Sequence, residues 1–552
     1  MLKKDSLLKG TLILALAALV ARVLGMFQRI PLEYMLDAEG ESAFIAANQI
    51  YLIALVIATA GFPSAISKMV SERMAAGKYQ EAKRIYKAAL LFGAVTGVLL
   101  ASVLVIFAPL YGTIIKQDSA TLAIRAIAPT LILFPIIAMM RGYFQGRQMM
   151  AAGGISQVVE QISRIVLGLA LGYYVLILGF SDTDAAAAIT FGNLFGSIGA
   201  FAVMIYYARK LKKQDQRFDQ QSHAEARAAL LPNQPYTFEN GSKIKFRTIY
   251  AEILKMSLPA LVTSMTINLV YFFDTTFFAR ITEQIYTFTQ SEEVYAILGN
   301  KAIPLAGIPP ILAIALGSSI IPIISAAFAR KDQREVDRQT SAVLKIVCLT
   351  GVPIALFLTL AAYSVTGLLY SSPSGSNVVA MLCAGTILQI TMMTTNSILY
   401  GMGKQRQTMV NTFVGLGAKI VISTICGIYF GIFGFILGST ACFLAVTLLN
   451  LRLIRKDVQL EVFGKKWTAY IIAIVISASV SILVHYLVIE LTSGLADKLS
   501  YLITVIISGS TLSLIYGILL LKLKVVTTED VESLPGKLRG PMKKVMRVVR
   551  AR

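Results

Sequence analysis

Fourteen apolar segments, each long enough to cross a lipid bilayer, constrain the fold of this chain more than any other feature of its sequence. Each holds close to the ~20 residues that a membrane-spanning helix needs. Hydrocarbon offers the backbone no hydrogen-bond partner, so segments of this length fold in it as helices. Charged residues make up only 15% of the 552, whereas soluble proteins carry about 25%. The sequence therefore predicts an all-α polytopic membrane protein with fourteen transmembrane helices, over residues 10–26, 44–67, 88–110, 121–140, 155–179, 185–207, 249–273, 303–328, 343–369, 377–399, 408–430, 434–451, 467–489 and 500–521.

A polar stretch over residues 208–247 separates the first six spans from the rest. It is rich in Lys, Arg, Gln and Asn, a composition that cannot bury enough apolar surface to fold alone. We therefore expect a flexible linker. The predicted organisation is an N-terminal lobe of six spans, this linker, a C-terminal lobe of six spans, and a last pair of spans followed by a basic tail, over residues 1–207, 208–248, 249–455 and 456–552.

The two lobes resemble each other when one is slid along the other. Residues 143–148 fall on residues 400–405, and at nearly the same offset Arg164 lands within two residues of Lys419. Because each unit crosses the membrane six times, the two units begin on the same side and have the same orientation. The pattern predicts a parallel repeat, a design that places the substrate site between the halves and works by rocking them.

The basic residues indicate the orientation of the chain. The net charge is +21, and most Lys and Arg fall in the loops and tails on one side of the predicted spans. This bias is typical of the cytoplasmic side of a membrane protein. The positive charge is therefore explained without nucleic-acid binding. We expect both termini and the linker to be cytoplasmic.

Motifs for cofactors and catalysis are not found. The chain has no phosphate-binding loop of the Gly-x4-Gly-Lys-Ser/Thr type. Its two histidines are far apart and its four cysteines lie in apolar spans without CxxC spacing, which indicates neither a metal site nor a disulfide framework. We expect no cofactor and no enzymatic activity. Transport would draw on the membrane potential, on a gradient of a monovalent ion, or on the gradient of the substrate itself.

Charged residues inside the spans are the candidate binding residues. A charge in hydrocarbon costs at least ~2.5–3.5 kcal/mol on insertion scales, so it needs a partner or a watery cavity. Arg22 lies twelve residues into the first apolar run with no acid within a turn, which favours a cavity role. Arg29 and Arg280 are equally well explained by snorkelling to the interface. Asp274 and Lys301 complete a set with more cations than acids, which favours an anionic substrate.

Glu160 and Arg164 form a separate charged pair in the fifth span. They are four residues apart, the spacing at which side chains meet on one face of a helix. The sequence therefore predicts a structural ion pair within this helix.

Three motifs carry a resemblance to a known family. The stretches Arg22-Val23-Leu24-Gly25, residues 61–67 (GFPSAIS) and residues 141–146 (RGYFQG) resemble the polysaccharide-biosynthesis branch of the multidrug/oligosaccharidyl-lipid/polysaccharide (MOP) exporter superfamily. Within that branch they are most similar to the Gram-positive type of lipid II flippase and to the stage V sporulation protein B type. The resemblance spans nearly the whole chain.

The resemblance implies fourteen helices in two lobes around a central cationic cavity, in the bacterial cell membrane. Within this cavity a lipid-linked disaccharide-pentapeptide pyrophosphate would be turned from the inner to the outer leaflet, with cell-wall synthesis enzymes as candidate partners. The family's essential arginine falls on Arg22, a second basic position on Arg29, an acid on Glu41 and a later basic position on Lys301. This chain departs from the Gram-negative branch, since residues 51–67 contain no basic residue.

Two other functions remain open at this point. A cation-coupled multidrug exporter of the same superfamily would need acids in its cavity, and Asp274 is the main candidate. A flippase for another polyprenyl-linked unit would share the cationic cavity. A membrane glycosyltransferase would need a catalytic acid in a sizeable outer loop, and the predicted outer loops are short.

Overall fold

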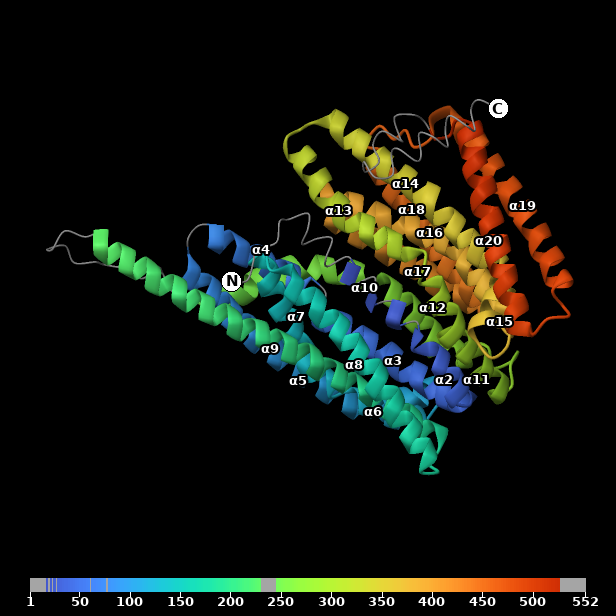
Figure 1. Cartoon of the computed structure of the whole chain (residues 1–552), viewed down its shortest axis with the longest axis horizontal. Coiled ribbons are helices and arrows are strands. Elements are labelled where there is room, and N and C mark those ends of the chain that lie inside the picture. The colour runs from blue at the N-terminus through green and yellow to red at the C-terminus, as the bar shows by residue number, and fades with distance from the viewer. Residues whose placement is uncertain are drawn as a thin grey trace. The chain divides into compact units, whose positions relative to one another are not determined.

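The computed structural model describes residues 16–229 and 245–526, apart from residues 18–19, 22, 26, 60 and 76–77. Every regular element in these residues is a helix (Figure 1). Eleven of the described helices are long and apolar enough to cross a membrane. The prediction of an all-α polytopic membrane protein is therefore confirmed, while the count of fourteen spans stays a prediction.

The chain divides into two compact units, Met1–Glu283 and Gln284–Arg552. The first contains α2 (Arg29–Met35), α3 (Ala38–Thr59), α4 (Phe62–Ala75), α5 (Tyr79–Ile115), α6 (Ala120–Ile127), α7 (Thr130–Gly146), α8 (Met150–Ile177), α9 (Asp182–Ala229) and α10 (Phe246–Ile281). Helix α10 packs against α3, α4 and α5. This division falls after α10, whereas the predicted boundary between the two lobes lies at the polar stretch before α10, and the predicted lobes stay a prediction.

The second unit is also entirely helical in its described part. It contains α11 (Phe288–Ala296), the π-helical turn η1 (Ile297–Ala302), α12 (Ile303–Ala306), α13 (Pro310–Ala329), α14 (Gln333–Leu360), α15 (Ala362–Leu369), α16 (Ser376–Gly401), α17 (Gln405–Phe430), α18 (Ile432–Ile454), the short turn η2 (Gly464–Lys466), α19 (Trp467–Leu491) and α20 (Asp497–Lys522).

The same packing pattern occurs in each unit. In the first, α4, α5 and α7 pack on one another, α7 packs on α9, and α8 packs on α9. In the second, α13, α14 and α16 repeat the first set of contacts, α16 packs on α18, and α17 packs on α18. The pairs α8–α9 and α17–α18 are the most extensive contacts of their units. This correspondence supports the duplication inferred from the sequence.

Glycines allow the helices of the α8–α9 pair to approach closely. A Cβ atom placed on Gly192 of α9 would lie only 2.3 Å from the Cα atom of Gly168 of α8. Small residues of this kind are characteristic of tightly packed membrane helices, where van der Waals contact replaces the hydrophobic effect. The α8–α9 pair is therefore a closely packed hairpin, and a larger side chain at Gly168 or Gly192 would push the two helices apart.

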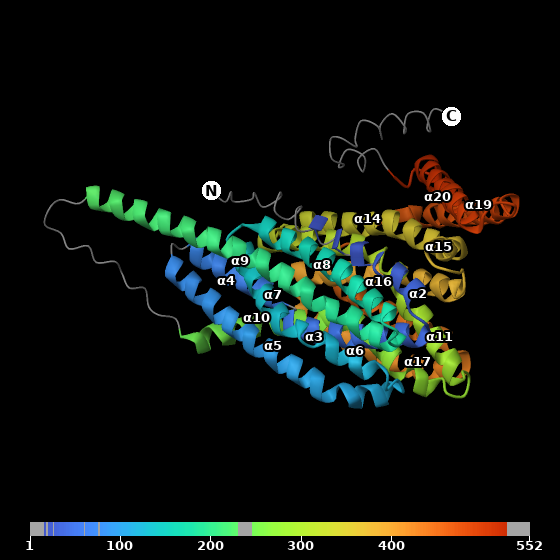
Figure 2. The same ribbon diagram turned by 60° about the horizontal axis from the view of Figure 1, so that its bottom comes forward.

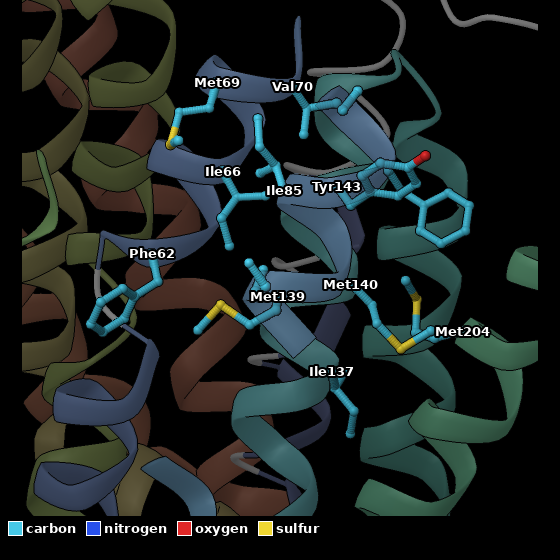
Figure 3. Packing of buried hydrophobic residues seen from close by; sticks show 14 of the residues in the cluster. Phe62, Ile66, Met69, Val70, Ile85, Ile137, Met139, Met140, Tyr143 and Met204 are labelled. Atoms are coloured by element: carbon cyan, nitrogen blue, oxygen red, sulfur yellow. The ribbon is translucent and has the colours of Figure 1, made fainter. Parts of the chain in front are cut away.

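The core of the first unit is a cluster of apolar side chains between α4, α5, α7 and α9. Val70 of α4 lies against α7, because a Cβ atom placed on Gly146 would come within 2.8 Å of it, and Met140 of α7 lies beside Met204 of α9 (Figure 3). Methionine fills irregular gaps between helices because its side chain is long and flexible. This cluster fixes the relative positions of the helices that carry the buried charges.

Helix α9 corrects part of the linker prediction. The predicted span ends at residue 207, but the helix continues to Ala229 (Figure 2), so the first half of the polar stretch is helical. These residues are mostly Ala, Lys, Arg, Gln and Glu without Gly or Pro, which are good helix formers. Extending an existing helix needs no new nucleus, and nucleation is the costly step. The prediction of a flexible linker was wrong for this half; residues 230–244 lie outside the described part.

Candidate functional site

A network of buried charges joins α7 to α8 inside the first unit. The guanidinium of Arg141 donates to Glu160 Oε2 at 2.7 Å and to Ser156 Oγ at 2.8 Å. Ser156 Oγ in turn donates to the carbonyl of Gly153 at 2.7 Å. The side chains of Arg141 and Glu160 are only 9% and 12% exposed. Glu160 is thus neutralised by an arginine on the neighbouring helix.

This arrangement corrects the predicted ion pair between Glu160 and Arg164. Arg164 instead donates to the amide oxygen of Gln161 at 2.5 Å. Its Nε atom is buried and makes no hydrogen bond, and no carboxylate in the described residues forms an ion pair with it. Glu160 and Arg164 have the i,i+4 spacing of an intrahelical pair, but Glu160 accepts its hydrogen bond from Arg141 of α7. Arg164 is therefore a half-buried cation without a carboxylate partner among the described residues.

The surroundings of Arg164 connect it to the start of the chain. A Cβ atom placed on Gly25 would lie 3.4 Å from a terminal guanidinium nitrogen of Arg164 and 3.6 Å from Gln161 Oε1. Tyr51 of α3 is buried and lies within electrostatic reach of Glu160 and Arg164. The segment around Gly25, α3 and α8 thus meet around this cation. Arg22 itself, the strongest candidate from the sequence, lies outside the described residues.

Two further predicted residues lie on α2 and α3. The guanidinium of Arg29 stands 5.6 Å from the centre of the Phe44 ring, a cation–π contact that stabilises a partly desolvated charge. Glu41 lies in the first turn of α3 and is 7% exposed. An acid at this position interacts favourably with the helix dipole. The Phe44 ring and the dipole of α3 thus stabilise these two charges within the protein.

Asp274 and Arg280 are on the same helix but have different environments. Asp274 of α10 is 3% exposed. Arg280 is exposed and donates to the carbonyls of Ile114 at 2.7 Å and Thr113 at 3.2 Å. These carbonyls belong to the last turn of α5, where a cation satisfies the unpaired acceptors and the helix dipole. The contact accounts for Arg280 without a substrate.

Lys301 belongs to the second unit, in the π-helical turn η1. It is 6% exposed, and its Nζ atom stands 5.5 Å from the centre of the Tyr370 ring. The Tyr370 hydroxyl donates to the carbonyl of Asn300 at 2.8 Å. Single π-helical turns occur frequently at functional sites. The turn and the tyrosine together hold this lysine in one orientation.

Lys419 is a buried cation that the sequence placed opposite Arg164 in the repeat. It is fully buried in α17, and its Nζ atom donates to the carbonyl of Phe435 at 2.9 Å and to Ser439 Oγ at 2.8 Å, both on α18. The lysine is thus satisfied inside its own hairpin. The sequence reasoning missed Arg141, whose signal was its place in the motif at residues 141–146, and it assigned Arg164 to an ion pair with Glu160 that the structure does not contain.

Comparisons with known proteins agree with this helical architecture. The model of the polysaccharide biosynthesis protein family matches residues 7–328. The chain is 28% identical over 434 residues to the lipid II flippase MurJ of Bacillus subtilis, covering 76% of this chain and 77% of that protein. It is 24% identical over 539 residues to the stage V sporulation protein B of the same organism, covering 96% and 98%.

Solved structures show the same fold. The lipid II flippase MurJ in an inward closed conformation aligns with a TM-score of 0.65 at 14% identity, covering 93% of this chain and all of that one. An inward-facing multidrug resistance MATE family transporter of the MOP superfamily aligns with a TM-score of 0.61 at 15% identity, covering 79% and 95%.

Proposed function

Because this chain belongs to the polysaccharide biosynthesis protein family of the MOP exporter superfamily, we propose that it is a flippase for a lipid-linked oligosaccharide pyrophosphate. The favoured cargo is lipid II, the peptidoglycan precursor, which would move from the inner to the outer leaflet of the bacterial cell membrane. Similarity over most of the chain to the lipid II flippase of Bacillus subtilis supports this choice.

The observation that carries the proposal is Arg164, a half-buried cation of α8 that has no carboxylate partner among the described residues. Glu160 is neutralised by Arg141, while Arg164 forms no ion pair with a described carboxylate and has a buried Nε without a hydrogen bond. An unneutralised guanidinium at this depth is stabilised by an anion or by water. A pyrophosphate fits because the planar fork of arginine binds phosphate oxygens bidentately.

The proposed mechanism follows from the predicted repeat. Two lobes of six helices in parallel orientation would alternately open a central cavity to the two sides of the membrane. Arg164, Arg22, Arg29 and Lys301 would contact the pyrophosphate, with Glu41 and Asp274 at the margins. The protein would act as a transporter and not as an enzyme. It would use no cofactor, and the membrane potential or a monovalent ion would supply the energy.

Complementation tests the cargo. Expression of this chain in a bacterium depleted of its own lipid II flippase should restore growth and cell shape. Failure to rescue at normal protein abundance, combined with rescue of a strain that lacks a flippase for another polyprenyl-linked unit, would assign the second cargo instead.

A multidrug exporter is the second candidate, and one observation favours it. Buried acids are what a cation-binding cavity needs, and Asp274 is buried in α10. Expression in a drug-sensitive strain separates the candidates, since an exporter raises resistance to cationic drugs and this resistance should vanish in Asp274→Asn. We expect no such resistance from the flippase.

A further inference from the structure

A large groove lies on the first unit between α5, α7 and α9. Its volume is about 980 Å³, at the upper end of the roughly 300–1,000 Å³ of small-molecule sites. All of its lining residues belong to these three helices. Its walls are apolar over most of their length, and the apolar side chains come from Leu90, Leu91, Ala94, Ile136, Met140, Phe201 and Ile205.

One end of this groove is basic. Lys83 and Lys87 of α5 and Arg209 and Lys212 of α9 line it there. Among the residues that line the groove, Asp215 is the one carboxylate. Its two oxygens accept hydrogen bonds of 2.7 Å each from the guanidinium of Arg147. The acid is therefore neutralised by a residue outside the lining, and the basic end of the groove keeps its positive charge.

The order of side chains along each helix produces this division. On α9, residues 201, 205, 208 and 212 lie on one face at the spacing of an α-helix, and they change from apolar to basic along the chain. On α5, residues 94, 90, 87 and 83 show the same change. The two helices line the same groove with their basic residues at the same end. The result is an amphiphilic groove.

The bias of basic residues toward one side of a membrane protein explains part of this pattern. It does not explain why cations from two helices line one groove. Lys210 and Lys213 lie on the same stretch of α9 and are exposed, yet neither lines the groove. Two tyrosines, Tyr86 and Tyr143, stack at 4.2 Å and line it as well. Tyrosine is enriched at the level of lipid headgroups because its ring is apolar and its hydroxyl is polar.

We propose that this groove binds an anionic phospholipid of the surrounding bilayer. The acyl chains lie along the apolar walls from Leu90 to Phe201, and the phosphate lies among Lys83, Lys87, Arg209 and Lys212. Basic pockets between membrane helices are suited to anionic lipid headgroups. A free phosphate would leave the apolar walls without a partner. The site holds α5 to α9 and is independent of the cargo that the protein moves.

Native mass spectrometry of the full chain in a neutral detergent tests the preference. We expect phosphatidylglycerol to be retained and phosphatidylcholine with the same chains to be lost. In Lys87→Glu/Lys212→Glu the apparent affinity for phosphatidylglycerol should fall about tenfold or more, because each cation near the phosphate contributes to binding. The matched control is Lys210→Glu/Lys213→Glu, with the same charge change on residues outside the groove, and it should retain the lipid. Equal losses in both variants would show a general basic surface and overturn the site.

The wild-type chain provides a test that does not depend on a variant folding. Phosphatidylglycerol with a photoactivatable acyl chain, incorporated into vesicles with the protein, should crosslink to peptides of α5, α7 or α9 around residues 90–94, 136–140 and 201–205. The groove-filling variant Ala94→Trp should reduce this crosslink. Crosslinks confined to other helices, or a crosslink that inorganic phosphate removes completely, would contradict a lipid in this groove.

Discussion

Arg141 on α7 donates a hydrogen bond of 2.7 Å to Glu160 on α8, and both side chains are buried inside the first unit. The ion pair joins two helices that are adjacent in the chain. It also determines whether Arg164 has a counter-charge. Because Glu160 is paired with Arg141, Arg164 forms no ion pair with a described carboxylate. The charge available to an anion in this unit is therefore set by a contact between helices.

The first prediction concerns the stability of this pair. Arg141→Ala should destabilise the protein by about 3–5 kcal/mol, because it leaves Glu160 buried without a counter-charge. The double variant Arg141→Met/Glu160→Leu should recover most of this loss, since it removes both charges together. Thermal unfolding in detergent measures both. Arg338→Ala is the control, because Arg338 pairs with Glu335 on the surface and such pairs contribute ~0–1 kcal/mol.

The second prediction concerns Arg164. Arg164→Ala should lose transport activity while the protein remains abundant and folded. The substitution removes a positive charge, but it breaks no ion pair with a described carboxylate. Arg164→Lys should retain part of the activity, since lysine keeps the charge but lacks the planar fork. Complementation with the amount of protein checked by blot makes the measurement. An abundant and fully active Arg164→Ala protein would assign this residue a packing role only.

The third prediction concerns Arg22. Its depth in the first apolar run predicts a contact with the pyrophosphate, and the loss of a charge-assisted hydrogen bond costs roughly 1.5–3 kcal/mol, or about ten- to a hundredfold in affinity. Arg22→Ala should therefore abolish rescue without reducing insertion. Arg29→Ala and Lys301→Ala should weaken rescue less. The anion-cavity model fails if Arg22→Ala is abundant and rescues fully.

The fourth prediction separates Arg280 from the substrate-binding residues. Arg280→Ala should leave transport unchanged and lower stability by about 0.3–1 kcal/mol, the contribution of a cation at an exposed helix C-terminus. Unfolding in detergent measures the stability of this variant, and complementation measures its transport activity. If the variant loses activity but keeps wild-type stability, Arg280 is a substrate-binding residue.

The fifth prediction tests the orientation. In a variant without its four native cysteines, Lys213→Cys should resist a membrane-impermeant thiol reagent added to intact cells, because α9 extends from the predicted cytoplasmic face. Ser493→Cys, exposed between α19 and α20, should react because this connection is predicted to lie outside. The reverse pattern would invert the orientation of the whole chain.

The sequence by itself determined the class of this protein. Long apolar runs fold as helices in hydrocarbon whatever surrounds them, so the long membrane helices among the described residues could be predicted. The repeat appeared in motifs such as residues 143–148 and 400–405. The charges inside the predicted spans, such as Glu160 and Arg164, could be identified as well, because a charge in an apolar run is costly and therefore rare. The family resemblance followed from short motifs on the same helices.

The tertiary structure decided which partner each charge has. Glu160 has Arg164 within reach on its own helix and Arg141 on the next, and only the packing of α7 on α8 selects Arg141. Arg280 reaches carbonyls of α5 that are distant in the chain, and α9 carries its helix to Ala229 through a stretch whose composition alone suggested a linker. The groove between α5, α7 and α9 likewise exists only where three separate helices meet. Which partner a charge finds depends on the distances between helices. Those distances are set by packing between helices, such as the close approach of Gly168 and Gly192. No local sequence pattern specifies this packing.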